Sequence, residues 1–113
     1  MKPFNVKVLP QAYDDIRQIK YHKEFYGAYQ ISIQKLMSDI KKTVKKLENM
    51  PLTGRRLSTY IGHDSDIRLK VINKEHLIFY KVVEYGDGGD VTVIRILPSK
   101  TDWTKEIFER KKW

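Results

Sequence analysis

Residues 76–97 read HLIFYKVVEYGDGGDVTVIRIL, two apolar runs on either side of a short stretch rich in glycine and aspartate. Leu77–Val83 is apolar at nearly every position, which predicts a central strand covered on both faces. Val91–Leu97 predicts the next strand, and Tyr85–Asp90 between them contains the residue types that tolerate the positive φ values of a hairpin turn. This stretch therefore predicts an antiparallel strand pair at the centre of the fold.

Two further strands are expected. Ile67, Leu69 and Val71 alternate with basic residues, and Asn73–Glu75 supplies the turn into the central pair. Phe4–Leu9 at the start of the chain has the same period of two. We therefore expect a three-stranded antiparallel meander that the N-terminal strand completes as a four-stranded sheet.

Two helices are expected between the first strand and the meander. Gln11 to about Phe25 and about Tyr29 to Leu47 place apolar residues three and four positions apart, and Gly27 separates the two runs. The short break predicts an antiparallel helical hairpin. Pro51 lies beyond the second helix, since proline cannot continue one. Residues expected in the core between hairpin and sheet are Leu36, Ile40, Val44, Ile78 and Tyr80.

Leu52–Ser65 is predicted to be a loop, and Asp102 is placed to cap a short helix from Trp103 to about Lys111. The order of elements is typical of an α+β fold, in which a helical hairpin lies on one face of an antiparallel sheet. With 113 residues, we expect one domain over residues 1–113.

The composition bounds the function. The formal net charge is +8, from 22 Lys and Arg against 14 Asp and Glu, which favours a nucleic acid, a nucleoprotein or an acidic protein as partner. The chain has no cysteine, which excludes disulfides and thiolate metal sites and suits the cytoplasm. We expect no metal, no cofactor, no signal peptide and no membrane span.

Four stretches in this order resemble the RelE/ParE superfamily of toxins from type II toxin–antitoxin systems. They are residues 8–16 (VLPQAYDDI), 47–57 (LENMPLTGRRL), 66–82 (DIRLKVINKEHLIFYKV), and 91–97 (VTVIRIL) with Asp102-Trp103. The resemblance covers almost the whole chain. It implies a cognate antitoxin as partner and one of two targets. RelE-like members cleave messenger RNA on the ribosome, whereas ParE-like plasmid stabilisation proteins inhibit DNA gyrase without catalysis.

Basic residues supply candidates for either role. RNA cleavage needs cations around the phosphate and an acid–base pair. Arg68 and Lys70 alternate on one strand, and we expect Arg95 to share a sheet face with Val91, Val93 and Leu97. Residues that could line one concavity with them are Arg55, Arg56, His76 and Lys100. The candidates for catalysis are Arg68, Lys70, His76, Arg95 and Lys100, and those for contacting a target or a phosphate are Arg55, Arg56, Arg68, Lys70 and Arg95.

The acid–base pair is harder to place. In RelE-like relatives an arginine follows the last strand and a tyrosine or histidine lies nearer the C-terminus, but here Thr101 stands at the arginine's place. No tyrosine follows Tyr85 and no histidine follows His76, so His76 is the remaining candidate base. Together with the long helical hairpin, this favours inhibition of gyrase. A ribosome-dependent endoribonuclease and a non-toxic basic binding protein remain alternatives.

The second expected helix also carries a stripe of lysines: Lys35, Lys41, Lys42, Lys45 and Lys46. Such a stripe is either a solvated face or a direct contact surface.

Overall fold

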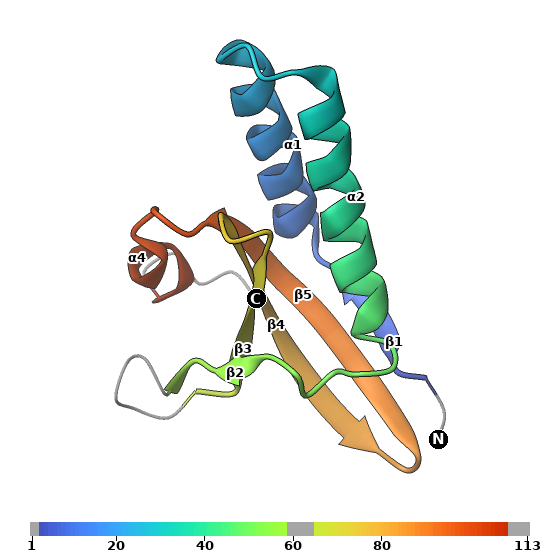
Figure 1. Ribbon diagram of the computed structural model, residues 1–113. Helices are drawn as coiled ribbons and strands as arrows, with labels where there is room; N and C mark the ends of the chain where they lie inside the picture. Colours follow the sequence, from blue (N-terminus) through green and yellow to red (C-terminus); the bar gives the residue numbers. More distant parts are fainter. Residues whose placement is uncertain (1–2, 59–64, 109–113) are drawn as a thin grey trace.

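The computed structural model describes residues 3–58 and 65–108 and has an α+β fold, with a helical hairpin standing over a twisted sheet (Figure 1). The elements are β1 (Asn5–Val8), α1 (Pro10–Phe25), α2 (Gln30–Lys46), β2 (Arg55–Arg56), β3 (Ile67–Ile72), β4 (His76–Tyr85), β5 (Gly88–Pro98) and α4 (Trp103–Phe108). Both predicted hairpin helices and the meander of β3, β4 and β5 are confirmed. Pro10 occupies the first turn of α1, where a missing N–H costs nothing.

The predicted four-stranded antiparallel sheet is wrong in two respects. The sheet has five strands in the order β1-β5-β4-β3-β2, because Arg55 and Arg56 pair with Leu69 and Arg68 inside the region predicted as a loop. Two residues are too few to show a period in sequence. β1 also runs parallel to β5, with Val6 opposite Val91, so the sheet is mixed. Alternation predicts a strand but not its direction.

Apolar side chains form a cluster on each face of the sheet. Between the sheet and the helical hairpin, Leu36, Ile40, Ile78 and Tyr80 are buried as predicted, with Val44 partly buried beside them. On the opposite face the buried cluster is Leu57, Ile67, Leu69, Leu77, Phe79, Ile94, Leu97 and Ile107. The central strand is therefore covered on both sides, as its unbroken apolar run indicates.

The turns and the last helix follow local sequence. Asn73 and Lys74 take positive φ values between β3 and β4, and Gly86 does so between β4 and β5. The backbone N–H of Lys105 donates to the Asp102 carboxylate at 3.4 Å, which is the predicted cap of α4. The predicted end of this helix near Lys111 lies outside the described residues. Among the helices that are described, none is long and apolar enough to cross a membrane.

Candidate functional site

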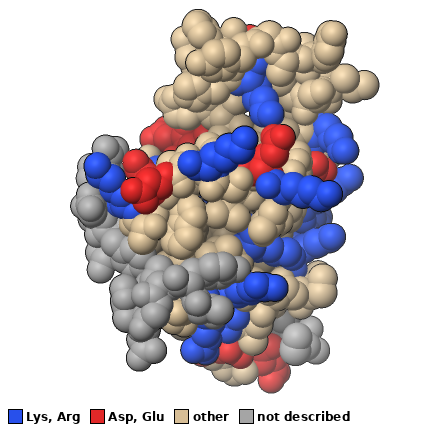
Figure 2. All heavy atoms as spheres, turned by 60° about the vertical axis from the view of Figure 1, so that its left-hand side comes forward, with Lys and Arg blue, Asp and Glu red and all other residues tan. Residues whose placement is uncertain are grey.

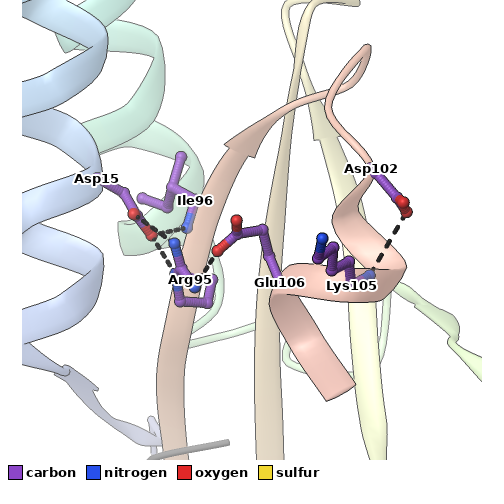
Figure 3. A network of polar contacts seen from close by, with 6 residues as sticks. All are labelled: Asp15, Arg95, Ile96, Asp102, Lys105 and Glu106. Atoms are coloured by element: carbon purple, nitrogen blue, oxygen red, sulfur yellow. Dashed lines mark hydrogen bonds and ion pairs between the residues drawn. The ribbon is translucent and has the colours of Figure 1, made fainter. Parts of the chain in front are cut away.

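Arg95 lies at the centre of a buried ionic network between α1, β5 and α4 (Figure 3). Its Nε and Nη2 donate to the two carboxylate oxygens of Asp15 at 2.7 and 2.9 Å, and its Nη1 donates to Glu106 at 3.3 Å. Asp15 also accepts the backbone N–H of Ile96 at 3.0 Å. These hydrogen bonds, chiefly those to Asp15, raise the pKa of Arg95 further, so the guanidinium stays charged and is held by two carboxylates.

The expectation that Arg95 shares a sheet face with Val91, Val93 and Leu97 holds for Leu97 and is wrong for Val91 and Val93. The pairing of β4 with β5 is irregular beside Phe79 and Tyr80, which face Arg95 and Val93 respectively, so one extra residue of β5 interrupts the alternation. Val93 consequently packs under the helical hairpin, whereas Leu97 packs on the opposite face. Since β1 pairs with β5 only as far as Val93, α1 can bring Asp15 to the uncovered edge beyond it.

His76 lines a cavity of about 650 Å³ beneath α1, which we call the α1 cavity. It begins β4, lies opposite Ile72 and Pro98, and is only 5% exposed. Its Nδ1 has no hydrogen-bond partner among the described residues. Burial and then the Lys23 ammonium lower the pKa of His76 below its ordinary value of 6.5, against an opposing effect of Glu75. The neutral imidazole is therefore the favoured form near pH 7.

Arg68 and Lys70 hold the segment that precedes β2. Arg68 Nη1 donates to the carbonyl of Gly54 at 2.9 Å, and the Lys70 ammonium lies 3.3 Å from the Thr53 hydroxyl. The N–H of Gly54 in turn donates to the Tyr80 hydroxyl at 2.8 Å. Both cations share a sheet face as predicted, but each has a structural partner there.

The structure does not bring the predicted cations into one concavity. Arg55 and Arg56 are successive residues of β2, so their side chains point to opposite faces of the sheet. Arg56 and Arg68 line a second cavity, of about 570 Å³, which His76 does not line. Lys100 is exposed in the turn after β5, and its neighbour Thr101, rather than Lys100 itself, lines the α1 cavity. No group of three or more His, Asp or Glu side chains within residues 3–58 and 65–108 could hold a metal ion.

The far end of the helical hairpin presents an apolar surface that sequence periodicity does not reveal. The apolar tip consists of Tyr21, Phe25, Tyr26, Tyr29 and Ile31, whose exposed fractions lie between 63% and 81%. The Phe25 ring packs against two others, with its centroid 5.2 Å from that of Tyr26 and 6.3 Å from that of Tyr21. In Figure 2 this end of the molecule is almost free of charged side chains, while Lys and Arg gather lower on the same face. Exposed apolar patches of this kind mark interaction surfaces.

The family follows from a match over most of the chain. Residues 6–103 match the family model described as the ParE toxin of the type II toxin–antitoxin system parDE. The chain belongs to the ParE toxin family. The match includes all four stretches that carry the resemblance in sequence, which are residues 8–16, 47–57, 66–82, and 91–97 with Asp102-Trp103.

A solved structure shares the fold of this chain. A chain of the chromosomal ParDE TA system from P. aeruginosa superposes with a TM-score of 0.63 at 17% identity, over 84% of this chain and 95% of that chain. At this identity the likeness concerns the fold alone. No curated protein sequence matches the chain.

Two features of this ParE toxin were not predicted from its sequence. Asp15 looks like an ordinary acidic residue in the first turns of a helix, yet it falls on the face that Ala12 and Ile19 bury. An acidic residue in that position, together with a single arginine in an apolar strand, is a signal that could have predicted the Asp15–Arg95 pair. The apolar tip had a weaker signal, an aromatic-rich stretch around Gly27 without a periodic apolar face.

Proposed function

We propose that this ParE toxin arrests growth by inhibiting DNA gyrase without catalysis, and that a cognate antitoxin neutralises it. The observation that carries the proposal is the dispersal of the predicted catalytic groups. Arg95 is neutralised by Asp15 and Glu106, while Arg68 and Lys70 hold a loop. His76 faces the separate α1 cavity. A nuclease needs its cations, base and acid around one phosphate, and these residues supply no such arrangement.

The apolar tip supports a protein as the target. Protein interfaces draw most of their binding energy from a few buried aromatic anchors, and the tip offers four exposed aromatic rings, two in the last turns of α1 and two in the connection to α2. A ribosome-bound messenger RNA would be held mainly through its phosphates, which an uncharged surface cannot bind. The tip therefore suits a toxin that binds and inhibits a protein target.

Two assays on purified protein test the proposal together. We expect the toxin to inhibit supercoiling by gyrase and to leave the ends of ribosome-bound transcripts unchanged. The variant Phe25→Ser/Tyr26→Ser, which removes two exposed anchors, should weaken the inhibition. The matched control Tyr13→Ser removes an exposed tyrosine of α1 away from the tip and should inhibit like the wild type.

His76→Gln separates the two mechanisms. Loss of a general base typically reduces a reaction by about 10²–10⁴-fold, so a nuclease that uses this imidazole would lose its activity. A gyrase inhibitor should retain its effect in this variant. Ribosome-dependent cleavage that vanishes in His76→Gln, with supercoiling unaffected by the wild type, would overturn the proposal in favour of a RelE-like endoribonuclease.

A further inference from the structure

The outer face of α2 carries an uncompensated row of positive charge. Five exposed lysines form this lysine face: Lys35, Lys41, Lys42, Lys45 and Lys46. None of the five forms an ion pair within the described residues. The sequence of α2 contains a single carboxylate, Asp39, which is half-buried. Lys45 and Lys46 lie in the last turn of α2, where a positive charge is stabilised by the negative end of the helix dipole. This effect does not explain the other three lysines.

Helix geometry turns these residues into a straight, rigid array. Lys42 follows the buried Ile40 by two residues, which places it about 200° around the helix and away from the core. Lys41 and Lys45 form one row, and Lys42 and Lys46 form a second row beside it, each with a rise of about 6 Å between its members. From Lys35 to Lys46 the array extends about 16 Å along the axis of α2.

The chemistry of the face favours a polyanion over a folded protein. Between Gln34 and Lys46 no large apolar side chain of α2 is exposed, so the face lacks the anchors on which protein interfaces depend. It also lacks the aromatic platforms on which single-stranded bases stack. Lysine binds phosphate as a point charge, and contacts to phosphate carry no sequence information, so the face suits a backbone contact without sequence preference.

We propose that the lysine face binds the phosphate backbone of duplex DNA. The choice of DNA among polyanions rests on the proposed function, because gyrase acts on duplex DNA. The lysine face lies along the shaft of the helical hairpin and the apolar tip at its end, so one element can present both surfaces at once (Figure 1). The toxin then contacts a protein through the tip and the DNA held beside it through the shaft.

Fluorescence anisotropy with a labelled 25-base-pair DNA duplex, over a series of salt concentrations, tests the surface without gyrase. Each phosphate neutralised contributes about 0.9 to the slope of log K against log salt. In the variant with Lys41, Lys42, Lys45 and Lys46 changed to Gln, the magnitude of the slope of log K against log salt should be smaller by about 3 to 4. The matched control changes four exposed lysines elsewhere (Lys7, Lys20, Lys74 and Lys105) to Gln and should keep most of it.

Both variants lower the net charge by the same amount, and circular dichroism checks that each is folded. Equal losses in the two variants would overturn the proposal, because general charge rather than this face would then carry the binding. Three other outcomes would overturn the proposal as well. The wild type could fail to bind the DNA duplex, or it could bind a duplex RNA of the same length more tightly. It could also bind a poly-glutamate peptide through these lysines without binding DNA. If the toxin inhibits gyrase but does not bind DNA, only the DNA-binding proposal is overturned. If the lysine face binds DNA but the toxin does not inhibit gyrase, only the gyrase proposal is overturned.

Discussion

Asp15 and Arg95 are each only 8% exposed at the side chain, so each charge depends on the other. We predict that Asp15→Ala lowers the free energy of unfolding by about 3–5 kcal/mol, because it leaves a buried guanidinium without its main partner. It also leaves the Ile96 N–H without its acceptor. A small domain has about 5–15 kcal/mol in total, so the loss is readily measured by urea denaturation.

The double variant Asp15→Leu/Arg95→Met is the control for this pair. Replacing both buried charges with apolar groups removes the uncompensated charge, so we expect a much smaller loss of stability than in Asp15→Ala. Glu106 is 22% exposed and can turn its carboxylate to solvent in this variant. If the double variant is as unstable as the single one, packing rather than charge explains the effect.

His76 should make stability depend on pH. Since burial lowers the pKa of His76 below 6.5, the unfolded chain binds this proton more readily than the folded chain. The contribution of neutral His76 to the free energy of unfolding is therefore complete above pH 6.5. It decreases as the pH falls below this value, by at most about 1.4 kcal/mol per pH unit. Denaturation midpoints between pH 7 and pH 5 measure the slope.

His76→Gln removes the buried imidazole and should flatten this slope. An unchanged slope in His76→Gln would show that another group takes up the proton. The window above pH 5 keeps this test apart from most carboxylate titration.

Among the elements, α2 gives the clearest test of packing. Ile40 is 4% exposed between α2 and the sheet, and Ile40→Ala should lower the free energy of unfolding by about 2–5 kcal/mol through lost burial and the cavity left behind. Ile31→Ala on the same helix removes a side chain that is 77% exposed and should change stability very little. Thermal melts of the two variants give the comparison, and similar melting temperatures would contradict the assigned core face.

Periodicity predicted the elements well and their pairing less well. The three- and four-residue spacing of Leu36 and Ile40 and the unbroken run around Ile78 each reflect burial, which the sequence records directly. The irregularity beside Arg95 does not depend on any one residue type, so the side of the sheet that Arg95 faces could not be predicted. β2 exists only because Arg55 and Arg56 lie against an existing strand.

The candidate site was less predictable than the fold for the same reason. Residue type identified Arg68, Lys70 and His76 as capable of phosphate chemistry, but their partners come from elements distant in sequence. Gly54 engages Arg68, and the α1 cavity encloses His76. A cation's availability depends on these contacts, and only the folded chain supplies them.

At the scale of the whole molecule, the formal net charge of +8 should govern the encounter with an antitoxin. We predict that the product of an adjacent gene co-purifies with the toxin and that it associates faster at low salt, since opposite charges steer diffusion. Once the complex has formed, apolar anchors should hold it, so its dissociation rate should vary less with salt than its association rate. Stopped-flow measurements separate the two rates, and a failure to associate at low salt would contradict the toxin–antitoxin assignment.

The parallel pairing of β1 with β5 affects how fast the chain can fold. Asn5 and Asp90 lie opposite each other although 85 positions separate them in the chain. Closing so long a loop costs entropy before any contact repays it, and folds rich in such distant pairings form slowly. Among the described residues, β5 is the last strand in chain order. The five-stranded sheet therefore cannot be complete until β5 has been synthesised, and the surfaces that depend on this sheet form only after that point.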